Sequence, residues 1–226
     1  MEKENQVTDY RYRLRFEKAG TFAYVSHLDL VRTFTRLFMR AELPLTFSEG
    51  FNPHPKMVFS APLPLGTESK TELLDFRTVA ELDLAEVLSR LREVSPLGLE
   101  IRELYPAEGK LSEIAFAAYT LTFAAPLDEA QTAAVSDFFA QSSIPAEKKG
   151  KDGIKTVDIR PMIASWERVS DTEIHALLSV SSEHFLNPDL FSSKLRSFLC
   201  ERCGAAPSAR MLRSAFYRAD GAALFR

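Results

Sequence analysis

The chain has 226 residues, of which 46% are hydrophobic and 26% are charged, a composition typical of a folded protein with one large or two small domains. Its formal net charge of -3 at pH 7 argues against a protein that binds polyanions indiscriminately. The sequence has no run of about eighteen apolar residues, so we expect no membrane-spanning helix. The polar start M-E-K-E-N-Q and only two cysteines, Cys200 and Cys203, favour a cytoplasmic protein without disulfides.

The first half of the chain is predicted to form a strand, a helix, two strands, a helix and a strand. Tyr10–Phe16 alternates with a period of two, as in a half-buried strand. Apolar residues at helical spacing predict a helix over His27–Ala41. Its inward face is expected to carry Leu28, Val31, either Phe34 or Thr35, and Phe38. The other predicted elements are strands at Met57–Ala61 and Leu73–Val79, a helix at Asp83–Val94 and a strand at Gly98–Tyr105.

The second half repeats this order of elements. It is predicted to contain a strand at Tyr119–Phe123, a helix at Asp128–Gln141, strands at Thr156–Ser165 and Glu173–Ser181, a helix at Asn187–Cys200 and a strand at Met211–Tyr217. Two consecutive β-α-β-β-α-β units of about a hundred residues each predict an α+β protein with tandem ferredoxin-like domains. The expected domains are residues 1–107 and 115–226, with a linker near Pro106–Ser112.

The first predicted strand places three arginines on one side. Its alternation turns Arg11, Arg13 and Arg15 away from the apolar residues, which must face the helices. Guanidinium groups on the open face of a sheet suit contacts with phosphates and stacking on bases. Two alternatives remain: the arginines pair with carboxylates across the sheet, for which Asp75 is a candidate, or the second domain covers them.

The start of the first helix carries a capping pattern and a histidine. Ser26 and Asp29 fit an N-cap and an acid near the helix dipole. His27 is not explained by capping and is either a packed or surface residue, or a base or hydrogen-bond donor. A basic stripe follows at i, i+4 and i+8, which is either a solvated face or an anion contact: Arg32, Arg36 and Arg40.

The loop 48–66 is rich in proline and aromatic residues. Gly50 suits a tight turn, and X-Pro steps force extended backbone around it. Asn52, His54 and Lys56 therefore lie in a stiff segment that either forms a preorganised binding site or covers a sheet edge. His27 and His54 are not accompanied by further ligands in the sequence, so no metal site is predicted.

Several of these motifs together resemble a known bacterial family. S-H-L-D-L-V-R (26–32), S-E-G-F-N-P-H-P-K (48–56) and V-D-I-R-P-M-I (157–163), which contains Arg160, look like blocks of the radical-SAM-linked proteins, whose function is unknown. The resemblance implies a partner radical SAM enzyme and supplies no established activity. The chain has no C-x-x-x-C-x-x-C for an iron–sulfur cluster, and no cofactor is predicted.

These observations leave three functional hypotheses. The first is an accessory protein without catalysis of its own, which binds an RNA substrate or another anionic partner and presents it to a radical SAM enzyme. Its expected surfaces are the cleft between the two domains, the arginines of the first strand, the loop around His54, Arg160 and the basic C-terminal third. The second is a metal-independent endoribonuclease, by analogy with CRISPR repeat-processing enzymes, with His27 as base and Lys56 or Arg32 stabilising the phosphorane. The third is a purely protein-binding adaptor that docks through Phe47, Phe51 and Phe59.

Overall fold

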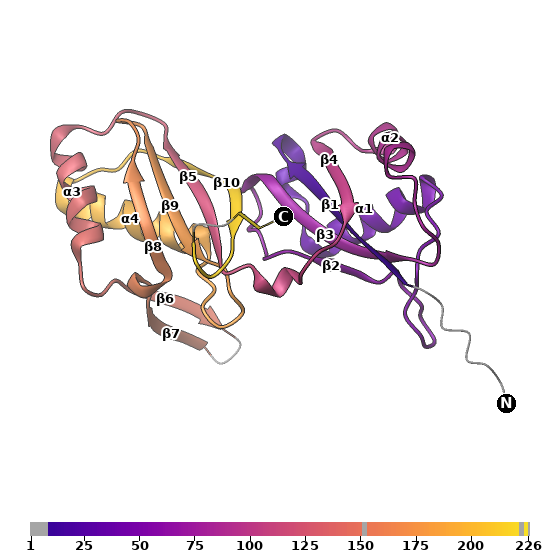
Figure 1. Cartoon of the computed structure of the whole chain (residues 1–226). Coiled ribbons are helices and arrows are strands. Elements are labelled where there is room, and N and C mark those ends of the chain that lie inside the picture. The colour runs from indigo at the N-terminus through magenta and orange to yellow at the C-terminus, as the bar shows by residue number, and fades with distance from the viewer. Residues whose placement is uncertain (1–8, 151–152, 222–223, 226) are drawn as a thin grey trace. The chain divides into compact units, whose positions relative to one another are not determined.

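The computed structural model of the chain describes residues 9–150, 153–221 and 224–225 and shows an α+β protein (Figure 1). Its residue contacts divide the chain into two compact units, which meet in sequence between Leu111 and Ser112. We call them unit 1 and unit 2. Within the described ranges, no helix is both long enough and apolar enough to cross a membrane.

Unit 1 contains an antiparallel sheet and two helices. In the sheet, β1 lies between β4 and β3, and β2 pairs with β3. The elements of unit 1, in chain order, are β1 (Tyr10–Lys18), α1 (His27–Arg40), β2 (Met57–Phe59), β3 (Glu68–Thr78), α2 (Leu84–Val94) and β4 (Leu99–Pro106).

The core of unit 1 forms where the apolar side of β1 meets both helices. Leu14 and Phe16 are fully buried together with Phe34 of α1 and Leu91 of α2. The rings of Phe16 and Phe34 lie 4.8 Å apart between centroids. Burial of such side chains stabilises the fold by about 1.5–3 kcal/mol each. The alternation of β1 thus fixes which face of the sheet the helices cover.

The inward face of α1 differs from the prediction. Leu30, Phe34 and Leu37 are buried, as is Phe38, whereas Leu28 is 59% exposed. The prediction for Leu28 is wrong because this residue is two positions from the buried Leu30, which at 3.6 residues per turn puts it on the opposite side of the helix. The Ser26 hydroxyl caps the start of α1 by accepting the backbone N–H of Asp29 at 3.2 Å.

Unit 2 has the same strand order in its sheet. β5 lies between β10 and β9, and β8 pairs with β9, all antiparallel; β6 and β7 form a separate hairpin (Figure 1). The elements of unit 2 are β5 (Phe116–Phe123), α3 (Glu129–Ala140), β6 (Pro145–Gly150), β7 (Gly153–Asp158), β8 (Ile163–Arg168), β9 (Glu173–Ser179), α4 (Pro188–Cys203) and β10 (Ala209–Tyr217).

One predicted strand of unit 2 is wrong. The segment Thr156–Ser165 is split between β7 and β8 by a short 3-10 helix over Arg160–Met162, and β6 was not predicted. Asp158 forms this corner, because its Oδ1 accepts the backbone N–H groups of Ile144 at 2.8 Å and Arg160 at 2.9 Å. These two hydrogen bonds hold the pKa of Asp158 below its ordinary value.

The lowered pKa of Asp158 predicts how the stability of the fold changes in acid. A carboxylate whose folded-state pKa is depressed stabilises the fold above its unfolded pKa of about 3.9, and this contribution is lost as the pH falls through the folded pKa. We expect Asp158→Ala to be less stable than the natural chain at pH 7, and the difference to shrink between about pH 5 and pH 2. Urea denaturation at a series of pH values measures this. A constant difference at all pH values would contradict it; Asp137→Ala on the exposed side of α3 controls for the loss of one charge.

Candidate functional site

The structure places Arg13 on the predicted face of β1 but not in solvent. Its side chain is fully buried, at 0% exposure, so the prediction of an exposed guanidinium is wrong for this residue. Nε donates to Asp75 Oδ1 at 2.6 Å and Nη2 to Asp75 Oδ2 at 2.9 Å, a bidentate pair across β1 and β3. Nη1 donates to the Glu108 carbonyl oxygen at 3.1 Å. Of the two alternatives, pairing with Asp75 is the one found here.

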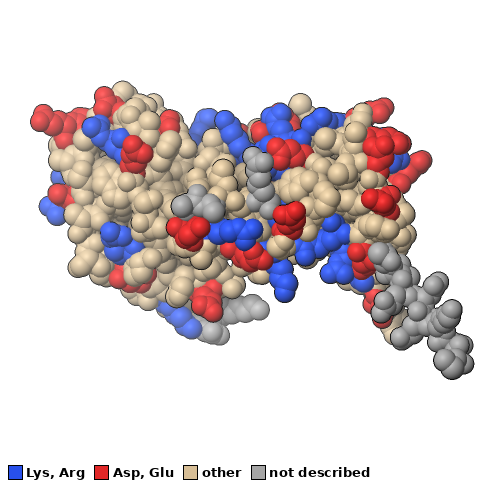
Figure 2. Space-filling view, viewed as in Figure 1, with Lys and Arg blue, Asp and Glu red and all other residues tan. Residues whose placement is uncertain are grey.

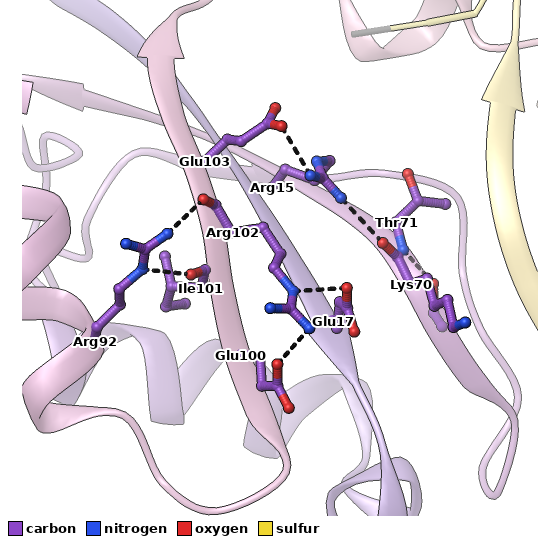
Figure 3. A network of polar contacts seen from close by, with 10 residues as sticks. Arg15, Glu17, Lys70, Thr71, Arg92, Glu100, Ile101, Arg102 and Glu103 are labelled. Carbon is purple, nitrogen blue, oxygen red and sulfur yellow. Dashed lines mark hydrogen bonds and ion pairs between the residues drawn. The ribbon is translucent and has the colours of Figure 1, made fainter.

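The two neighbouring arginines are partly exposed and also lie beside carboxylates. Arg11 Nη2 is 3.4 Å from Asp75 Oδ2. Arg15 Nη2 donates to Glu103 Oε1 at 2.8 Å, and its Nη1 donates to the Lys70 carbonyl oxygen at 3.3 Å (Figure 3). Arg15 therefore has a carboxylate of its own, whereas Arg11 shares Asp75 with Arg13, and among the described residues no hydrogen bond reaches the buried Nε and Nη2 of Arg11.

Arginine side chains also lie beside carboxylates at the other end of β1 and β4. Arg102 lies between Glu17 and Glu100, at 2.6 and 2.5 Å, and the hydrogen bond that its Nε donates to Glu17 is the main reason that the pKa of Arg102 is raised (Figure 3). Arg92 donates to the carbonyl oxygens of Ile101 and Arg102. Figure 2 shows Lys and Arg interspersed with Asp and Glu on the visible surface of unit 1. The open face of this sheet is thus close to electrically balanced.

The solvent side of α1 has a different character. Leu28 and Met39 are exposed there, at 59% and 63%. Arg32 pairs with Asp29 at 3.0 Å, whereas the described residues provide no ion-pair partner for the exposed Arg36 and Arg40. We define the α1 face as Leu28, Arg32, Arg36, Met39 and Arg40. It combines apolar surface with an excess of positive charge.

A second group of exposed apolar side chains lies at the start of α1. The exposed ring of His27 meets the edge of Phe59, with centroids 5.4 Å apart. Tyr24 lies over Gly66, which has φ +83°, and a Cβ at this glycine would lie 3.0 Å from the tyrosine ring. Leu65, beside it, is also exposed. We define the loop patch as Tyr24, His27, Phe59 and Leu65.

The histidine in this patch is not oriented as a catalytic base. Among the described residues, none forms a hydrogen bond with the His27 ring, and its ring contact is apolar. A general base is ordinarily held by a second polar group. No group of three or more His, Cys, Asp and Glu side chains in the described part of the chain would hold a metal ion.

The first part of the predicted loop forms a hairpin. Ser48 N–H donates to the His54 carbonyl at 2.8 Å, and Lys56 N–H donates to the Thr46 carbonyl at 2.9 Å. The Ser48 hydroxyl also lies 2.9 Å from His54 Nδ1, and Lys56 Nζ is 3.8 Å from Asp9. Asn52 and the fully exposed Phe51 lie at the tip. The prolines therefore stiffen a hairpin that carries these polar residues on its arms and tip.

Arg160 braces the fold. Its Nε donates to the Gln141 carbonyl oxygen and its Nη1 to the Ile163 carbonyl oxygen, both at 3.2 Å. The guanidinium thereby ties the end of α3 to the start of β8. The V-D-I-R-P-M-I block forms the corner between β7 and β8.

Sequence reasoning missed the exposed apolar residues Tyr24, Leu28, Met39 and Leu65. Leu28 and Met39 flank the arginine stripe at helical spacing, so their position on the solvent side of α1 follows once the buried stripe is known. Tyr24 ends a short 3-10 helix, Gly20–Tyr24, and Leu65 lies in a turn, so the periodicities of strands and α-helices do not predict which way these two side chains point.

The Arg13–Asp75 pair generates a stability prediction. Asp75→Ala leaves a buried guanidinium without its partner, which destabilises a fold by about 3–5 kcal/mol, whereas Arg13→Met with Asp75→Leu removes both charges and is expected to destabilise much less. Arg15→Ala, at the partly exposed pair with Glu103, should change stability by about 0–1 kcal/mol. Urea denaturation of the variants measures these effects. Equal, small losses for Asp75→Ala and Arg15→Ala would contradict a buried pair.

Comparison with known proteins gives a family. A family model described as an uncharacterized protein conserved in bacteria (DUF2344) matches residues 11–188. A search of curated proteins finds no match. Among solved structures, an unknown protein from Galdieria sulphuraria is 11% identical, with 90% of this chain and 99% of that chain covered and a TM-score of 0.28, and this likeness carries no argument. The family match spans most of the sequence, and the chain belongs to the bacterial DUF2344 family.

Proposed function

We propose that this protein is a cytoplasmic accessory module that docks onto a partner protein through the α1 face and the loop patch of unit 1. The observation that carries the proposal is the distribution of exposed apolar side chains. Most of the large ones in the described chain belong to unit 1, and Tyr24, Leu28, Met39 and Leu65 lie on α1 or beside its start. Apolar surface that gathers in this way is typical of protein-interaction sites.

The positive charges on α1 indicate which kind of partner surface would be complementary. Arg36 and Arg40 extend the apolar residues of α1 with positive charges that the described residues do not neutralise. A complementary surface has apolar anchors at its centre and carboxylates along one edge. The sequence resemblance to radical-SAM-linked proteins makes a radical SAM enzyme the proposed partner.

The fold supports a module of two similar halves. Both units place their strands in the order fourth, first, third, second when each unit's sheet strands are counted along the chain, with a helix after the first and third. The β6–β7 hairpin is an insertion in unit 2. This order is that of a ferredoxin-like sheet, so we propose tandem ferredoxin-like domains.

The other two hypotheses have less support. RNA binding through Arg11, Arg13 and Arg15 requires free guanidinium groups, but Asp75 and Glu103 lie against them. RNA cleavage with His27 as base requires a group that orients the ring, and the described residues supply none. Protein docking needs neither.

The docking proposal predicts a localised loss of affinity. Leu28→Glu places a charge among apolar contacts, and Arg36→Glu with Arg40→Glu reverses the complementary charge. We expect each variant to bind the purified radical SAM enzyme at least about tenfold more weakly than the natural chain, measured by calorimetry. Val169→Glu makes the same kind of change at an exposed apolar residue of unit 2. As the control, it should bind the enzyme as tightly as the natural chain.

Two results would contradict the proposal. One is unchanged affinity of both unit 1 variants, and the other is an equal loss from Val169→Glu. Thermal unfolding of each variant checks that the substitutions, all at exposed positions, leave the fold intact.

A further inference from the structure

On the face of the unit 2 sheet that the helices do not cover, small side chains form a shallow depression, which we call the floor. On β5, Ala117, Tyr119 and Leu121 are buried toward the helices, so Ala118 faces the other way. The strand register sets one row of mostly small residues across four strands: Ala215, Ala118, Leu177 and Ser165. A row of small side chains in a sheet surface leaves a depression above it.

Residues with larger side chains lie on both sides of this floor. Two residues further along β10 is Tyr217, and two residues back along β9 is His175, which lies opposite Glu167 of β8. These three residues, with Ser165 and Ser214, line a hollow of about 580 Å³. That volume lies in the usual range of small-ligand sites, about 300–1,000 Å³.

Among the polar residues that line the hollow, Glu167 carries a carboxylate, whereas the Ser and Tyr hydroxyls and the His175 ring can each donate or accept a hydrogen bond. Glu173 Oε1 lies 2.7 Å from His175 Nε2 and holds that ring in place. Glu167 is exposed, and within the described residues it has no hydrogen-bond or ion-pair partner. An ionised carboxylate accepts hydrogen bonds only, so a ligand must bring N–H or O–H groups to it.

We infer that this hollow binds a guanine base, which lies over the floor of Ala118 and Leu177 with its N1–H and exocyclic amine donated to the Glu167 carboxylate. The two parallel donors of guanine match the two oxygens of a carboxylate, as a guanidinium does. Single-stranded bases are recognised in this way, by their flat face and their hydrogen-bonding edge.

The charges of the rim set the orientation. The carboxylates of Glu167 and Glu173 disfavour a phosphate inside the hollow, so the sugar and phosphate point outward to solvent. The guanine comes either from a free nucleoside or from single-stranded RNA. The inference concerns unit 2 alone and does not rest on docking by unit 1.

Calorimetry of the full chain with guanosine, inosine and adenosine tests the inference. Inosine lacks the exocyclic amine and adenosine lacks both donors, so we expect each to bind at least about tenfold more weakly than guanosine. Short uridine-rich RNAs with and without one guanine form the second arm. Tighter binding of the guanine-containing RNA than of guanosine identifies RNA as the source, and binding of guanosine alone identifies the nucleoside.

Variants locate the site. Glu167→Gln replaces one acceptor oxygen by a donor and should weaken guanosine binding at least about tenfold, while Glu201→Gln, the same change at the exposed end of α4, should not. Ala118→Leu fills the floor and should abolish binding, with thermal unfolding as the check on folding. The inference is overturned if neither guanosine nor the guanine-containing RNA binds at millimolar concentration, if adenosine binds equally well, or if Glu167→Gln binds like the natural chain.

Discussion

The buried ion pair between Arg13 and Asp75 is the constraint on which the rest of unit 1 depends. A guanidinium cannot lie at 0% exposure without a matched acceptor, and the bidentate carboxylate of β3 supplies it. The pair also fixes the register of β1 on β3. Since Leu14 and Phe16 share that strand, the same register places the hydrophobic core beneath the helices.

Carboxylates beside the arginines of this sheet are the reason why we propose that unit 1 docks through another surface. Arg11 and Arg13 share Asp75, and Arg15 lies against Glu103, so these two carboxylates offset two of the three positive charges and weaken the field that this face offers to an anionic partner. The α1 face combines Arg36 and Arg40 with exposed apolar groups. Unit 2 differs again, because small residues on its open face leave a hollow whose lining includes the Glu167 carboxylate. The two units thus present different chemistry on the same strand order.

The sequence predicts elements better than depth of burial. The alternation of β1, the Ser26 cap and the order of strands and helices follow from local patterns. Alternation tells which side Arg13 occupies but not how deeply it lies, because depth depends on residues distant in sequence such as Asp75 and Glu108. Helical spacing also predicts an inward Leu28, but an apolar residue at that spacing can equally lie on the solvent side, as Leu28 does. The break between β7 and β8 depends on hydrogen bonds to Asp158 that no periodicity signals.

Site-specific photo-crosslinking tests the central claim, that unit 1 meets its partner through α1 and not through the open face of its sheet. A photoreactive side chain is placed at position 28 or at position 103, and each protein is irradiated with the purified radical SAM enzyme. We predict a crosslinked complex from position 28 and none from position 103. A complex from position 103 alone would contradict the account.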